Sequence, residues 1–324
     1  MLSKIFNPVV FQGNLKDRHY FEGWYYKQVS GDERCAVSFI PGISLFPDDL
    51  HSFVQYIYVN IDKNTNKTIR TGYIRYPLEA FKFNHSPFMI SIGENIFSET
   101  AATVKLSDQE VNIQGILWLD TFTPIKNSLL TPNIMGFFGY IPWMECYHGV
   151  ISMNHILQGS LTINSNEIDF NNGKGYIEKD WGTSFPEKYI WIQCNNFNNK
   201  TVSIFSSAAD IPFMGKKFKG YICNLSIDRK EYRFATYNSS KLRIERLDSK
   251  TAVLVFENRH AILTIEAMLK QPGELVAPKM GNMEKRIAED LSGKVTIKLY
   301  DKQKKTAYED IGCMAGIEIA GYKC

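Results

Sequence analysis

Short apolar runs rich in β-branched and aromatic residues recur along this chain, and polar, often asparagine-rich segments separate them. Such runs are typical of β-strands, and the polar segments between them are typical of hairpin loops. The clearest runs cover residues 54–60, 160–163, 189–194, 201–205 and 295–299. Many strands at short spacing favour sandwiches or barrels, so the pattern predicts an all-β fold.

One segment near the end departs from this pattern. Met283, Ile287 and Leu291 recur at i, i+4 and i+8, and charged residues fill positions 284–290. This spacing predicts one short helix, with Gly293 as its stop. We expect the helix to plug or flank the β structure.

Two segments far apart in the sequence, 20–27 and 175–186, each place an acid shortly before a tryptophan. Their similarity indicates two similar β units. Asparagine and glycine cluster at 164–174, which marks a loop. We therefore expect an N-terminal β domain over 1–165 and a C-terminal β domain over 166–324.

Composition is that of an ordinary globular protein, with 44% apolar and 22% charged residues over 324 positions. The net charge of +3 is dispersed, whereas nucleic-acid binding needs a concentrated stripe of charge, so we expect no nucleic-acid partner. No apolar stretch reaches the length of a signal peptide or a membrane-spanning helix, and we expect a cytoplasmic protein. The scattered cysteines favour reduced thiols; they are Cys35, Cys146, Cys194, Cys223, Cys313 and Cys324.

Together with the stretch 132–150, the two acid and tryptophan segments resemble the tocopherol cyclase family. Weaker matches at 275–278 and 315–318 extend the resemblance over nearly the full chain. It implies two lipocalin-like β-barrel or sandwich halves, akin to the AttH-like and hydroxyneurosporene synthase proteins. For the plant members it also implies closure of a chromanol ring from a prenylated hydroquinone.

Such a ring closure needs a proton for an alkene, a shielded carbocation and a phenol oxygen close to it. It needs no metal, nucleotide or redox cofactor, and we expect none here. The sequence agrees, because it contains no glycine-rich phosphate loop, no H-E-x-x-H motif and no G-x-S-x-G nucleophile elbow.

Glu178 and Asp180 are the leading candidates for the acid. If 175–181 is a strand, both carboxyls share a face with Tyr176, while Lys179 lies on the opposite face. Like charges that close resist joint ionisation, so one carboxyl could keep its proton and act as general acid. The alternative is that Glu178 or Asp180 forms a structural ion pair, for example with Lys27 or Lys179.

Glu22 is a second candidate acid, on a strand face shared with Trp24, whose alternative role is to pack the floor of a barrel. Glu145 and His148 are further candidates, because a histidine near an acid can relay a proton. If a strand begins at His148, residues 148, 150, 152 and 154 share a face. A metal at Glu145, His148 and His155 is not expected, since the two rings would lie on opposite faces.

Aromatic and amide side chains near these acids are expected to bind the substrate. An aromatic face stabilises a cation and an amide holds a hydroxyl, although each could equally be a packed wall residue. The candidates are Trp24, Tyr26, Trp143, Asn154, Trp181, Trp191 and Gln193.

Three hypotheses for function remain open at this stage. The first is a cyclase acting on a prenylated aromatic or similar isoprenoid. The second is a hydratase that adds water across an isoprenoid double bond by the same protonation. The third is a carrier that binds a hydrophobic small molecule without chemistry. Each implies a hydrophobic small-molecule partner, and peripheral membrane contact and the oligomeric state stay undetermined.

Overall fold

The computed structural model describes residues 2–142, 144–213 and 216–322, and over these the chain is almost entirely β. The one α-helix among them is α1 (Leu2–Phe6), accompanied by the 3-10 turns η1 (Leu78–Ala80), η2 (Gly136–Tyr140) and η3 (Thr236–Asn238). The predicted all-β class is confirmed. No helix in these ranges is long and apolar enough to cross a membrane.

Two compact units divide the chain. The first comprises Met1–Phe185 and Gly273–Ile287, and the second comprises Pro186–Pro272 and Ala288–Cys324. The boundary expected after residue 165 lies in the turn between β10 and β11, within the first unit. Each unit has its own hydrophobic core.

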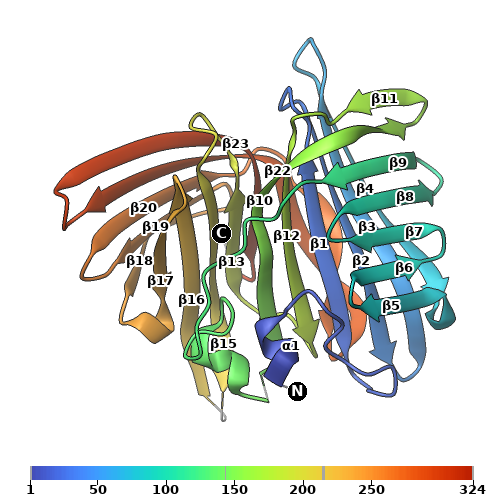
Figure 1. Cartoon of the computed structure of the whole chain (residues 1–324), viewed down its shortest axis with the longest axis horizontal. Coiled ribbons are helices and arrows are strands. Elements are labelled where there is room, and N and C mark those ends of the chain that lie inside the picture. Colours follow the sequence, from blue (N-terminus) through green and yellow to red (C-terminus); the bar gives the residue numbers. More distant parts are fainter. Residues whose placement is uncertain (1, 143, 214–215, 323–324) are drawn as a thin grey trace. The chain divides into compact units, whose positions relative to one another are not determined.

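A 12-stranded antiparallel sheet forms the first unit, in the order β4-β3-β2-β1-β12-β10-β9-β8-β7-β6-β5, with β11 paired to β10. Figure 1 shows the short strands β5 to β9 running across the long strands β2 to β4. Aromatic contacts join the long strands to the short ones, for example Trp24 of β1 with Phe81 of β5 and Phe39 of β2 with Phe97 of β7. The sheet therefore folds into a sandwich with open edges. Its strands are β1 (Phe21–Val29), β2 (Cys35–Phe46), β3 (Asp49–Ile61), β4 (Lys67–Pro77), β5 (Phe81–His85), β6 (Phe88–Ile92), β7 (Asn95–Ser98), β8 (Ala101–Ser107), β9 (Asn112–Leu119), β10 (Cys146–Ile163), β11 (Asn166–Asp169) and β12 (Lys174–Gly182).

An 11-stranded antiparallel sheet supplies the second unit, in the order β17-β16-β15-β13-β23-β22-β20-β19-β18, with β14 and β21 off this path. The bounds are β13 (Tyr189–Cys194), β14 (Asn196–Phe197), β15 (Ser203–Phe213), β16 (Lys216–Ile227), β17 (Lys230–Ala235), β18 (Lys241–Leu247), β19 (Thr251–Glu257), β20 (Ala261–Met268), β21 (Gly273–Lys279), β22 (Asn282–Asp301) and β23 (Thr306–Ala320). β21 and the first residues of β22 belong to the first unit.

The helix predicted over 283–291 is wrong, because these residues lie in β22. Spacings of four and eight are even, so the same three apolar residues also share one face of a strand. Gly293 does not stop the element; it lies inside β22 at a register shift and pairs with Ala315. The Asp290 carboxylate supports this irregularity by accepting hydrogen bonds from the backbone nitrogen and the hydroxyl of Ser292, at 2.8 and 2.7 Å.

Candidate active site

Strand β12 lies between β1 and β10 at the centre of the first sheet, and its two faces carry different polar groups. Directly paired residues of antiparallel strands point to the same face. Asp180 pairs with His148 of β10, and Glu178 pairs with Val150 of β10 and Tyr25 of β1. The alternation predicted for this segment is confirmed, with Glu178 and Asp180 on one face and Lys179 on the other.

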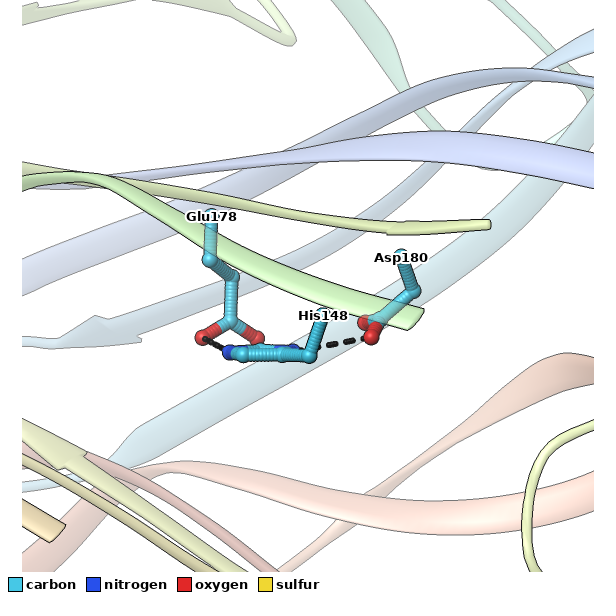
Figure 2. A group of neighbouring side chains, drawn as sticks. All are labelled: His148, Glu178 and Asp180. Carbon is cyan, nitrogen blue, oxygen red and sulfur yellow. Dashed lines mark hydrogen bonds and ion pairs between the residues drawn. The ribbon is translucent and has the colours of Figure 1, made fainter. Parts of the chain in front are cut away.

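The His148 imidazole lies between the two carboxylates on this face (Figure 2). Its Nδ1 is 2.8 Å from Asp180 Oδ1, and its Nε2 is 3.4 Å from Glu178 Oε2. The Tyr176 hydroxyl donates to the same Glu178 oxygen at 2.5 Å. Two hydrogen bonds, between His148 and Asp180 and between Tyr176 and Glu178, and the ion pair between His148 and Glu178 link these four side chains, which we call the proton relay. Tyr176 is the member that sequence reasoning did not select, although the alternation placed it on this face.

Electrostatics keep a proton in the relay at neutral pH. Burial alone would lower the pKa of His148, but the neighbouring Asp180 and Glu178 carboxylates outweigh it and raise that pKa to about 10. Burial and the nearby Glu178 carboxylate raise the pKa of the Tyr176 hydroxyl well above its usual range. The relay therefore holds a histidine proton between two carboxyl groups.

His148, Glu178 and Asp180 also offer three ligand atoms within 4.8 Å of one another. A single metal ion, however, binds an imidazole through one ring nitrogen. In the relay the two carboxylates flank opposite nitrogens of one ring, which suits proton transfer along the ring better than chelation of one ion. Histidines 148 and 155 lie on opposite faces, as predicted, because His155 pairs with Gly175.

Glu22 lies on the other face and forms an ion pair with Lys179, and both side chains are fully buried. The Glu22 carboxylate also accepts hydrogen bonds from the backbone nitrogens of Gln12 and Gly13 and from the Tyr20 hydroxyl. These donors and the Lys179 ammonium group together satisfy the buried carboxylate. The structural ion pair considered for Glu178 and Asp180 is thus formed by Glu22.

Lys179 fastens the N-terminal segment to the sheet. Its ammonium group donates to the carbonyl oxygen of Pro8 at 2.9 Å and to that of Val10, and it lies 4.6 Å from the centre of the Trp24 ring and 5.0 Å from that of Trp181. Burial lowers the pKa of Lys179 to about 8 against the opposing effect of Glu22. The side chain therefore remains charged at neutral pH.

Three aromatic candidates belong to this second face. The Trp24 indole donates to the Val9 carbonyl at 2.7 Å, and the Tyr26 hydroxyl donates to the Ser98 carbonyl at 3.1 Å. Trp181 stacks on Tyr147, with ring centres 5.5 Å apart. Trp24 and Tyr26 are fully buried in the core of the first unit, so their observed contacts are those of packed wall residues.

Glu145 and Asn154 lie outside the relay. The Glu145 side chain is exposed, just before β10 begins. A β-bulge after Val150 brings Ser152 into register with Ile177, on the face opposite Glu178. Of the residues 148, 150, 152 and 154, which were expected to share one face, His148 and Val150 are paired regularly with β12 on the face of Glu178. Asn154 is half-buried and lies within a second register shift, between Ser152 and His155. The bulge could not be read from the alternation.

Trp191 and Gln193 belong to the second unit, on β13. Both are buried, and they alternate with Ile190 and Ile192 of that unit's core, as predicted. Trp191 pairs with Glu318 of β23, whose carboxylate accepts a hydrogen bond from the Tyr189 hydroxyl. Trp143 lies outside the described residues.

A second polar cluster escaped sequence reasoning. Gln28 and His155 both pair with Gly175, one from each neighbouring strand, and both are almost completely buried. His155 Nδ1 lies 3.0 Å from the Ser152 hydroxyl, and burial lowers the pKa of His155 to about 3, so the ring is neutral. These residues come together only through the pairing of β1, β12 and β10, so no local sequence motif predicts the cluster.

Comparison with known families identifies the chain. Residues 71–321 match the family described as tocopherol cyclase-like. The chain belongs to this family. A probable tocopherol cyclase of Oryza sativa subsp. japonica is 23% identical over 258 residues, which cover 75% of this chain and 53% of the rice protein. The tocopherol cyclase of Zea mays is 30% identical over 138 residues, 42% of this chain and 27% of the maize protein. The matched regions thus span about half or less of these tocopherol cyclases.

Solved structures share the fold of this tocopherol cyclase-like chain. CghA with Sch210972 superposes with a TM-score of 0.57 and 9% identity, over 94% of this chain and 89% of that chain. An AttH-like protein of Nitrosomonas europaea gives 0.53 and 12%, over 94% and 93%. Kievitone hydratase from Nectria haematococca gives 0.50 and 9%, over 93% and 88%. At these identities the likeness establishes the fold alone.

Proposed function

We propose that this chain closes a ring on a prenylated hydroquinone or a similar isoprenoid by acid catalysis, with the proton relay as its acid and base. The observation that carries the proposal is His148 between Asp180 and Glu178, with Tyr176 bonded to Glu178. The family membership supports the reaction type, since two relatives are named as tocopherol cyclases.

In this proposal the His148 imidazolium passes its Nε2 proton to the Glu178 carboxylate, and Glu178 delivers that proton to the alkene. The proton adds to one carbon of the alkene, the π bond breaks, and a tertiary carbocation forms at the other carbon. The phenol oxygen then forms the new C–O bond, and the phenol proton passes to the Glu178 carboxylate and from there back to Nε2 of His148. The reaction is an isomerisation without a co-reactant, which general acid and base catalysis by one relay can support.

The other two members of the relay hold Glu178 and His148 in position. Asp180 accepts from Nδ1 of His148 and fixes the ring so that Nε2 faces Glu178. The Tyr176 hydroxyl orients the Glu178 carboxyl. Tyr25, directly opposite Glu178 on β1, places an aromatic ring next to the acid on the same face, where its π electrons could stabilise a cation.

The surroundings of the acids also weigh against a simple carrier. Charged groups weaken apolar binding, so a carrier would be expected to neutralise Glu178 and Asp180 with lysine or arginine or to turn them to solvent. Glu178 is buried, and both carboxylates face a titratable imidazole. This arrangement favours proton transfer.

The test is incubation of purified protein with a prenylated hydroquinone in D2O, followed by mass analysis of the product. We expect a chromanol carrying one deuterium on the protonated carbon. Glu178→Gln should slow its formation about 100-fold or more, the range of general acid catalysis. Glu79→Gln, an exposed acid far along the sequence from the relay, serves as the matched control and should act like the unmodified chain.

Two other outcomes would replace the proposal. A product heavier than the substrate by one water would indicate a hydratase, which uses the same protonation with water in place of the phenol. Stoichiometric retention of the hydroquinone without turnover, unchanged in Glu178→Gln, would indicate a carrier.

A further inference from the structure

An apolar surface that the proposed function does not use lies in the connection between β9 and β10. Leu129 and Leu130 are 81% and 80% exposed, Phe137 is 48% exposed and Tyr140 is 36% exposed. We call these four residues the apolar tip. Single exposed apolar residues are ordinary, but neighbouring leucines at this exposure indicate a surface that a membrane or a partner protein covers.

The tip is held in a defined conformation. Leu129 and Leu130 are the two central residues of a tight turn, in which Ser128 and Thr131 exchange backbone hydrogen bonds at 2.9 and 3.1 Å. The Tyr140 hydroxyl donates to the Leu129 carbonyl at 2.7 Å. Turn centres are normally occupied by glycine, asparagine, aspartate or proline. Two leucines there expose apolar surface that the turn itself does not require.

The charge of the segment indicates what covers the tip. Residues 121–142 contain no aspartate or glutamate and a single charged residue, the exposed Lys126. An acid-free segment with one cation complements a lipid surface, where carboxylates are disfavoured and phosphate groups attract lysine. Leucine is under-represented among protein-interface hot spots, whereas leucine and aromatic residues are the usual insertion groups of peripheral membrane proteins.

We propose that the apolar tip docks this chain on a lipid bilayer, with Leu129 and Leu130 inserted among the acyl chains and Phe137 and Tyr140 at the headgroup level. Docking of this kind stands on the tip alone and does not depend on any catalytic activity. With only one lysine in the segment, it is driven mainly by apolar burial.

A cavity beside the tip gives docking a use. It has a volume of about 420 Å³, and its lining includes Phe122, Ile125, Asn127 and Pro132 from the same connection, together with Phe6 and Val9. The segment that reaches the membrane thus also forms a wall of this cavity, whose lining further includes polar residues such as Glu99 and Asn133. Entry of an isoprenoid from the bilayer into this cavity rests on the proposed function; the docking itself does not.

The test is flotation of the whole chain with large unilamellar vesicles, one set of phosphatidylcholine and one with 30% phosphatidylglycerol. We expect the unmodified chain to float with both, with binding at most about fivefold stronger to the anionic set, as for one lysine near the surface. The double substitution Leu129→Ser with Leu130→Ser should lower the partition coefficient about tenfold or more.

Trp118→Ser is the matched control, because Trp118 is 56% exposed on β9 of the same unit and lies outside the tip. It should bind vesicles like the unmodified chain, and far-ultraviolet circular dichroism should show that both variants are folded. The proposal is overturned if the unmodified chain floats with neither set or if the double variant floats equally well. It is also overturned if the leucines prove to hold two copies together, seen as a halved mass by light scattering in a variant whose flotation is unchanged.

Discussion

At the residue scale, His148 is the group through which pH acts on the relay. Its pKa is about 10 in the folded chain, against an ordinary value of 6.5, because two carboxylates hold the imidazolium. The folded chain therefore binds this proton more tightly than the unfolded chain. The resulting stabilisation is fully present below about pH 6.5 and is lost as the pH rises through about 10.

We predict that His148→Gln removes this dependence. The difference in free energy of unfolding between the unmodified chain and the variant should shrink as the pH rises from about 6.5 to about 10, by at most about 1.4 kcal/mol per pH unit. Urea unfolding at pH 6.5, 8 and 9.5 measures it. A difference that stays constant or grows over this range would mean that His148 is not held protonated by Asp180 and Glu178.

The buried pair of Lys179 and Glu22 leads to a second prediction at this scale. Lys179→Met leaves the Glu22 carboxylate buried without its cation, and we expect a loss of about 3–5 kcal/mol in the free energy of unfolding. Adding Glu22→Gln to this variant should restore part of the loss, because no unpaired charge then remains.

The exposed pair of Lys105 and Glu94, whose side chains are 60% and 70% exposed, is the matched control. Lys105→Met should cost less than about 1 kcal/mol, as is usual for surface ion pairs. Equal costs for Lys179→Met and Lys105→Met in chemical unfolding would contradict the role assigned to Lys179.

At the element scale, the packing of β1, β12 and β10 depends on the missing side chain of Gly175. A Cβ at this position would lie 2.0 Å from Nε2 of His155 and 2.5 Å from Oε1 of Gln28. We predict that Gly175→Ala lowers the free energy of unfolding by about 2 kcal/mol, within the range for overpacked cores. Adding His155→Ala should recover part of this loss, since it reopens the space.

Gly23 of β1 provides the control for this prediction. A Cβ there would meet its nearest atom, Cγ2 of Ile40, at 3.6 Å, which is an ordinary contact. Gly23→Ala should therefore change stability by about 0.5 kcal/mol or less. Equal stabilities of the two alanine variants in thermal or urea unfolding would contradict the close approach that the structure shows at Gly175.

The elements also show how far the sequence could lead. The alternation at 175–181 correctly assigned the faces of Glu178, Asp180 and Lys179, because a strand fixes them locally. Even spacing of apolar residues in β22 could not distinguish a strand from a helix. The partner of Lys179 depends on pairing with a strand far away along the chain, and the bulge after Val150 has no sequence signal, so neither could be predicted.

At the scale of the whole molecule, the all-β class and the relation to the family follow from patterns that run the length of the chain. The path of the chain between the units does not. The chain leaves the first unit after Phe185 and returns to it for Gly273–Ile287 before it completes the second. Such a return depends on long-range contacts of β21, which composition and turn signals do not encode.

Those contacts make the first unit dependent on its distant segment. Gln55, buried on β3, donates to the Val276 carbonyl at 3.1 Å and accepts from the Val276 nitrogen at 2.6 Å, and the Ser44 hydroxyl donates to the Gly281 carbonyl at 2.7 Å. Without residues 273–287, buried polar groups on β2 and β3 lose their partners. Each unsatisfied group costs about 1–3 kcal/mol.

We predict that a chain of residues 1–185 is less stable than the same residues joined through a glycine and serine linker to 273–287, by about 2–5 kcal/mol. Both versions keep β1 to β12, so the comparison isolates the contribution of the returning segment to the first unit. Urea unfolding followed by tryptophan fluorescence measures the difference. A third version with Gln55→Leu should reduce the advantage of the joined chain, because the leucine cannot bond to Val276. Equal midpoints for the short and the joined chain would show that residues 273–287 are not an integral part of this unit.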